Sequence, residues 1–137
     1  LFLESHWAYK NRIQEMRDYF EIPITFKIGV ETFDYDFRNG YLNKNAKFKT
    51  VEELKEYFDS PCIMVGIKGQ TREMIDRDMD IVLNNFDHAT INVFVNNTSS
   101  VKRDEELVNW FSNKYKHLVD NPKIEILFNN TDFGVGD

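Results

Sequence analysis

Polar side chains of the kinds that bind small ligands recur where short apolar runs of this chain end. The positions concerned are Glu4, Glu31 with Thr32, Lys68 with Gln70, Asn96 with Asn97, and Asn129 with Asn130. Carboxylates accept hydrogen bonds, amides and hydroxyls both accept and donate them, and few cations accompany these groups here. Such a set suits a sugar or an amino-acid group better than a bare polyphosphate.

The apolar runs themselves predict the elements that must position these side chains. Residues 1–4, 24–30, 63–67, 91–95 and 124–128 predict strands, and helix-length segments separate them. Crossovers of this length return parallel strands, and they are right-handed in nearly all proteins. We therefore predict an α/β fold with about five parallel strands, either an open sheet or a partial (β/α) barrel. In both, the carboxyl ends of the strands form one edge, where ligands bind.

Capping residues predict where several helices begin, and the spacing of apolar residues predicts which helix faces are buried. Thr50 with Glu53 forms a capping box, and Thr71 and Asp104 are expected to cap two longer helices. In the first helix, after Ser5, the predicted buried face is Tyr9, Ile13, Met16 and Phe20. In the helix after Thr71, the acidic and basic residues 76–78 and 80 are expected mostly on the solvent side.

Composition limits the class of protein. The length of 137 residues fits a single domain, and the net charge of -6 disfavours non-specific binding to nucleic acid or to an anionic membrane. We expect no membrane span, because no apolar run approaches the required length. The single cysteine, Cys62, fits a reducing cytoplasm and is expected to be buried, and the three histidines lack metal-ligand spacing. We therefore predict no metal site within this chain.

Several motifs have two interpretations. Gly66-x-x-Gly69-Gln70-Thr71 is either a tight turn with a helix cap or a ligand-binding loop. Glu31 is either a solvated carboxylate or a ligand-binding one, and Lys44 is either a surface lysine or an ion-pair partner for a ligand. Asn97 and Asn130 suit turns as well as substrate contacts.

Read in order, these motifs resemble a known family. Leu3-Glu4, Gly29-Val30-Glu31-Thr32-Phe33, Lys44 and Gly66-Ile67-Lys68-Gly69-Gln70-Thr71 resemble the second half of a radical S-adenosylmethionine (SAM) barrel. The pattern is most similar to that of the oxygen-independent coproporphyrinogen oxidase group. It covers residues 1 to about 98, and it does not include the tail from residue 129 onward.

The resemblance implies a cofactor site. Glu4 would face the amino group of SAM, Glu31 and Thr32 would approach its ribose hydroxyls, and Lys44 would meet its carboxylate, with Gln70 nearby in the pocket. Three residues depart from the pattern. Glu31 replaces Gln, Lys44 replaces Arg, which loses the bidentate fork, and Cys62 lies where the group often has an acidic residue. The three-cysteine loop that holds a [4Fe–4S] cluster in this superfamily is not in this chain.

We therefore expect residues 1–137 to be a single domain that forms the C-terminal part of a longer radical SAM barrel. The chain would bind SAM and a small-molecule substrate, with Asn97 and Asn130 on the substrate side, and it would be catalytically silent without the missing N-terminal part. One alternative is a stand-alone β/α module that binds a sugar or nucleotide without redox chemistry. Another is a structural fragment that forms a homodimer through exposed sheet edges.

Overall fold

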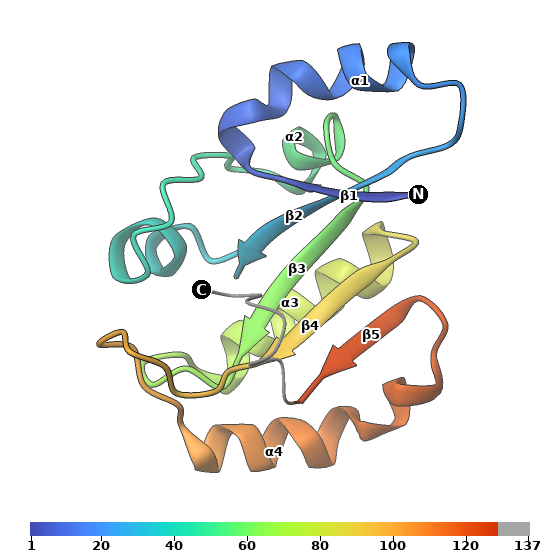
Figure 1. The fold of residues 1–137 in the computed structure, drawn as a ribbon. Coiled ribbons are helices and arrows are strands. Elements are labelled where there is room, and N and C mark those ends of the chain that lie inside the picture. The colour runs from blue at the N-terminus through green and yellow to red at the C-terminus, as the bar shows by residue number, and fades with distance from the viewer. Residues whose placement is uncertain (129–137) are drawn as a thin grey trace.

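The structure, a computed structural model, describes residues 1–128 and contains one sheet of five parallel strands. The strands lie in chain order, β1-β2-β3-β4-β5 (Figure 1). Their bounds are β1 Phe2–Ser5, β2 Thr25–Glu31, β3 Ser60–Val65, β4 Ala89–Val93 and β5 Ile124–Leu127. Within residues 1–128 the sheet is open, with β1 and β5 at its edges, which confirms the predicted α/β fold with an open sheet or partial barrel of about five parallel strands.

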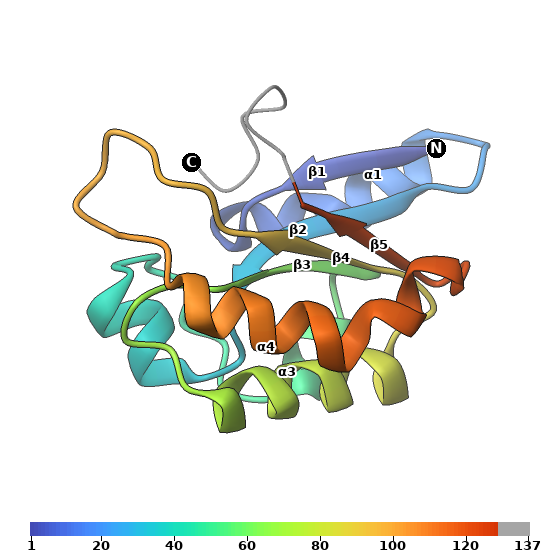
Figure 2. The same ribbon diagram turned by 90° about the horizontal axis from the view of Figure 1, so that it is seen from below.

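Helical segments connect the strands. They are η1 Trp7–Arg12, α1 Ile13–Tyr19, η2 Phe37–Tyr41, α2 Val51–Lys55, α3 Arg72–Asn85, α4 Glu105–Tyr115 and η3 Lys116–Asp120. Figure 2 shows α3 and α4 beneath the sheet, against the same face. Strands in sequential order with right-handed crossovers place their helices on one face, as in a barrel wall. None of the helices in residues 1–128 combines the length and apolarity that a bilayer span requires.

Side chains alternate between the two faces of the sheet along each strand, and one of these faces is covered by the helices. In β2, Phe26, Ile28 and Val30 are fully buried and belong to the main hydrophobic core. Ile63 and Val65 of β3 continue this core. The side chains between them point to the other side of the sheet, which we call the inner face. Its members in the described strands include Glu4, Lys27, Glu31, Cys62, Met64, Thr90 and Asn92.

The predicted helix caps are confirmed. Thr50 Oγ1 accepts a hydrogen bond from Glu53 N at 3.1 Å, and Thr71 Oγ1 accepts one from Met74 N at 3.1 Å. Asp104 Oδ1 accepts from Leu107 N at 3.0 Å. Local side-chain chemistry therefore determines where these helices begin.

The prediction for the first helix was wrong in its capping residue, its helix type and part of its buried face. His6, not Ser5, caps the segment, and η1 is a 3-10 helix with three residues per turn. This tighter winding turns Tyr9 to solvent, at 56% exposure, whereas Trp7 packs on Phe48 with ring centroids 5.3 Å apart. Phe20 follows the end of α1 and is also exposed.

Candidate functional site

A cavity of about 200 Å³ lies at the carboxyl ends of β2, β3 and β4. Strand ends and the loops that follow them supply its walls. The lining residues are Glu31, Leu42, Lys44, Met64, Ile67, Phe94, Asn97, Ser99 and Val101. Three residues predicted as site residues, Glu31, Lys44 and Asn97, therefore lie around one cavity at the predicted edge of the sheet.

Glu31 and Lys44 form the charged side of this cavity. Lys44 Nζ lies 3.3 Å from Glu31 Oε1, and their side chains are 25% and 14% exposed. Burial raises the pKa of Glu31, and the ammonium of Lys44 partly offsets that rise. Gly29 lies beneath the pair, because a Cβ there would meet Lys44 Nζ at 3.1 Å. The arrangement presents one anionic and one cationic group side by side.

The backbone of Glu31 is strained. Its φ of 69° lies in the left-handed region, which residues with a side chain rarely adopt. Such conformations cost about 1–3 kcal/mol and persist where neighbouring contacts hold them, often at ligand sites. The bend occurs where the register between β2 and β3 shifts, and it directs Glu31 to the cavity.

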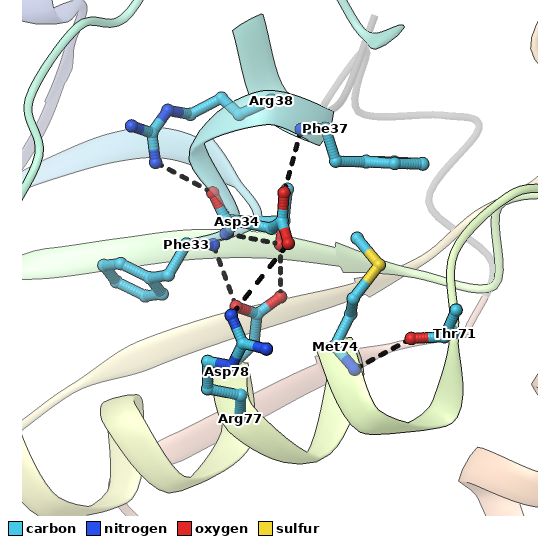
Figure 3. A network of polar contacts seen from close by, with 9 residues as sticks. Phe33, Asp34, Phe37, Arg38, Thr71, Met74, Arg77 and Asp78 are labelled. Carbon is cyan, nitrogen blue, oxygen red and sulfur yellow. Dashed lines mark hydrogen bonds and ion pairs between the residues drawn. The ribbon is translucent and has the colours of Figure 1, made fainter. Parts of the chain in front are cut away.

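A buried carboxylate anchors the chain directly after Glu31 (Figure 3). Thr32 Oγ1 donates to Asp78 Oδ2 at 2.7 Å, and Phe33 N donates to Asp78 Oδ1 at 2.8 Å. Asp34 N in turn donates to Thr32 Oγ1 at 3.1 Å. The expectation that Asp78 lies on the solvent side was wrong, since Asp78 is 1% exposed. It is buried because its carboxylate accepts hydrogen bonds from the end of β2.

This network changes the assignment of Thr32. Its hydroxyl is fully buried and committed to Asp78 and Asp34, so it does not line the cavity. Through this bond to Asp78, Thr32 fixes the backbone next to Glu31 and does not contact the cavity itself.

Arg38 holds the loop that carries Lys44. Its guanidinium donates to the carbonyl oxygens of Ala46 at 2.9 Å, Thr32 at 3.1 Å and Phe48 at 2.6 Å, and it is 1% exposed. The same group lies 3.8 Å from the centre of the Phe48 ring. A buried arginine with these partners fixes the segment between η2 and α2, and Lys44 N donates to Arg38 O at 3.0 Å.

Gln70 also has a supporting position. Its Oε1 accepts from Gly66 N at 2.9 Å and Ile67 N at 3.2 Å, and its Nε2 donates to Met64 O at 3.0 Å. These bonds shape the turn after β3, which places Ile67 in the cavity wall. In this structure the Gly66–Thr71 motif therefore acts as a turn with a helix cap.

Of the other predicted site residues, the structure describes Asn97 and Glu4, and Asn97 lines the cavity whereas Glu4 does not. Asn97 lies in the loop after β4, and its Oδ1 accepts from Ser99 N at 2.8 Å. Glu4 is exposed at the end of β1, opposite Lys27 in the sheet register. Asn130 lies outside the described residues.

The opposite wall of the cavity is apolar. Met64, Ile67 and Phe94 form a small buried cluster, against which Phe37, Leu42 and Val101 pack. A cavity with an ion pair on one side and apolar groups on the other suits a ligand that is itself part polar and part apolar. Residues 1–128 contain no group of three or more His, Cys, Asp or Glu side chains that could hold a metal ion.

Comparison with known proteins places this geometry in a family. The chain matches no protein-family model and no curated protein. Among solved structures it is similar to "queuine lyase from Clostridium spiroforme bound to SAM and queuine", with 51% identity and a TM-score of 0.94. That neighbour is a radical SAM enzyme. This similarity confirms the predicted resemblance to the radical SAM superfamily.

Within this superfamily, the chain corresponds to the C-terminal part of the barrel, as the strand-end motifs predicted. The match covers 100% of this chain and 60% of the neighbour, so the chain spans less than two thirds of that radical SAM protein. The more specific likeness to the coproporphyrinogen oxidase group stays a prediction.

Two supporting residues were missed by sequence reasoning. Arg38 and Asp78 occur in polar stretches that are typical of solvent-exposed segments, so no pattern singled them out. One signal was available for the loop, because Asn43 and Asn45 flank Lys44 and asparagine tolerates the left-handed conformation that both adopt. Such a pair indicates a loop with a defined shape.

Proposed function

We propose that this chain forms the SAM- and substrate-binding half of a radical SAM enzyme. The observation that carries the proposal is the Glu31–Lys44 pair in a cavity that is also lined by the apolar cluster of Met64, Ile67 and Phe94. The neighbour with the same fold is bound to SAM, and SAM combines charged amino-acid groups with a ribose and a flat base.

Each lining group then has a chemical role. The Glu31 carboxylate accepts hydrogen bonds from the ribose hydroxyls, and the Lys44 ammonium pairs with the carboxylate of SAM. Glu4, which lies on the inner face of β1, faces the SAM amino group. The apolar wall made by Ile67, Phe94 and Val101 excludes water from the base. Thr32 and Gln70 position the cavity walls without touching the ligand.

Residues 1–128 do not fit a [4Fe–4S] cluster, because they include one cysteine and no cluster of metal-binding side chains. We propose that the N-terminal part of the barrel supplies the cluster ligands and pairs with the free edge of β1. Bound together, SAM and the cluster supply the radical chemistry of this superfamily. The chain's own residues bind and orient SAM and shield it from water. By itself the chain is therefore expected to be catalytically silent.

For the substrate we propose a base of the 7-deazapurine type, the class to which queuine belongs. The support is the 51% identity with a lyase that is bound to queuine. Asn97 lies in the cavity wall, from which it can contact this second ligand. The free thiol of Cys62 and an oxygen-sensitive cluster both fit a reducing cytoplasm. A homodimer through the sheet edges stays a prediction.

The test is calorimetric binding of SAM to the full-length, cluster-loaded protein. Lys44→Ala and Glu31→Gln should each weaken SAM binding about tenfold, because each removes a charge-assisted contact in a partly buried site. Lys47→Ala is the matched control, since Lys47 is exposed on the same loop and should leave the affinity unchanged. Unchanged affinity in both cavity variants would refute the proposal and favour a different ligand, such as a sugar or nucleotide.

A further inference from the structure

Two buried polar atoms on the inner face of β4 lack hydrogen-bond partners. They are Thr90 Oγ1 and Asn92 Oδ1, and neither has a partner among residues 1–128. Both side chains belong to residues that are 2% exposed. Buried polar atoms in folded proteins almost always have partners, so an exception needs a cause.

Apolar and polar residues alternate along β4, so its two faces differ in chemistry. Ala89, Ile91 and Val93, which point toward the helices, are apolar and fully buried. Thr90 and Asn92 alternate with them and point to the inner face. Valine and leucine would fill similar space at these positions without leaving a polar atom unpaired, so packing does not explain the threonine and the asparagine.

Their position relative to the cavity is defined by the sheet register. Asn92 lies opposite Met64, and Thr90 lies opposite Cys62. Met64 lines the cavity, so Asn92 lies beside a residue of the cavity wall, and Thr90 lies two residues further from the carboxyl end of β4. The flexible side chain of Met64 can move aside to admit a ligand group.

The neighbouring thiol does not satisfy Thr90. Burial raises the pKa of Cys62 to about 11, so this thiol is neutral at physiological pH. The hydroxyl of Thr90 influences that pKa, yet no hydrogen bond of ordinary geometry joins the two groups. Glu125, opposite Thr90 on the β5 side, adds a carboxylate to the same face.

We propose that Thr90 and Asn92 form a substrate subsite that binds the N–H-bearing edge of a guanine-type base. The amide oxygen of Asn92 accepts a hydrogen bond, and the hydroxyl of Thr90 accepts or donates one. A base edge that carries ring N–H and amino groups beside a carbonyl oxygen complements this pair. The inference rests on the proposed function and assigns its substrate to particular residues of this chain.

The experiment uses the full-length, cluster-loaded protein and the variants Thr90→Val and Asn92→Leu. Thermal unfolding without ligand measures whether the polar atoms are unpaired in the free protein. Calorimetry with queuine in the presence of SAM measures the subsite, and calorimetry with SAM alone measures the neighbouring cavity.

We expect each variant to unfold about 2–4 °C higher than wild type, because it removes an unpaired buried polar atom. Each should bind queuine at least about tenfold more weakly, with SAM affinity unchanged. Ser60→Ala is the matched control. Ser60 Oγ is a buried inner-face hydroxyl that has a partner, His88 Nδ1 at 2.6 Å, so its removal should lower the unfolding temperature without affecting queuine binding.

Three outcomes would overturn the inference, and they are distinguishable. Queuine affinity equal to wild type in both variants would refute the subsite alone. A lower unfolding temperature in both variants would show that the atoms have structural partners, and would also refute it. Wild-type protein that binds SAM but neither queuine nor guanine would refute the proposed substrate class, and the subsite with it.

Discussion

Thr32 Oγ1 donates a hydrogen bond to Asp78 Oδ2 across 2.7 Å, which ties the end of β2 to the buried side of α3. Asp78 Oδ1 also accepts from Phe33 N, so one carboxylate holds both residues that follow Glu31. Because Glu31 has a left-handed backbone, this anchor keeps a strained residue at the cavity.

Asp78 should make stability pH-dependent. Burial raises its pKa from 3.8 to about 7, so the folded protein binds this proton more tightly than the unfolded chain does. The free energy of unfolding should therefore fall as the pH rises between about 4 and 7, by about 2–4 kcal/mol. Asp78→Asn, which cannot ionise, should remove this part of the pH dependence in urea unfolding. Asp80→Asn, on the exposed side of α3, is the control. An unchanged profile for Asp78→Asn would contradict the argument.

Glu31 offers a test of stored strain. Glu31→Gly should keep or raise the free energy of unfolding by up to about 1 kcal/mol, because glycine adopts a positive φ without strain. Glu31→Ala keeps the strain and should be less stable than Glu31→Gly. Both should lose SAM affinity, since both lack the carboxylate. Equal stability of the two variants in chemical denaturation would count against a strained Glu31.

Arg38 should link loop order to ligand affinity. Arg38→Lys keeps the charge but loses the planar fork that reaches three carbonyl oxygens, so it should lower the free energy of unfolding by about 3 kcal/mol. SAM affinity should also fall, because the loop that carries Lys44 loses its support. Arg12→Ala, which changes an exposed arginine, should alter neither property. Full SAM affinity in a folded Arg38→Lys protein would show that the loop needs no such support.

Much of this fold was accessible from sequence, for identifiable reasons. The strands and the caps at Thr50, Thr71 and Asp104 depend on local pattern and side-chain chemistry, and polar strand ends gather wherever parallel strands share an edge. The roles of Thr32 and Gln70 were not accessible. Thr32 bonds Asp78, whose burial depends on how α3 packs against β2. Gln70 bonds the backbone of its own turn, and the sequence left this turn open between a structural and a ligand-binding role. Thr90 and Asn92 have the sequence pattern of ordinary strand residues, because the inner face is created by the pairing of the strands.

Gly66 should be intolerant of any side chain. Its φ is +94°, and an added Cβ would lie 2.4 Å from Val108 Cγ2 on α4. Gly66→Ala should therefore lower the free energy of unfolding by about 2–4 kcal/mol, through both backbone strain and overpacking. Gly40→Ala is a matched control, since nothing lies within 4 Å of the added atom there. Similar denaturation midpoints for the two variants would contradict the close approach of the turn and α4.

The most direct measurement is a crystal structure of the full-length protein with SAM bound. We predict that the ribose hydroxyls lie within hydrogen-bond distance of the Glu31 carboxylate and that the SAM carboxylate lies beside the Lys44 ammonium. SAM bound elsewhere, with the Glu31–Lys44 pair intact and remote from it, would contradict the account.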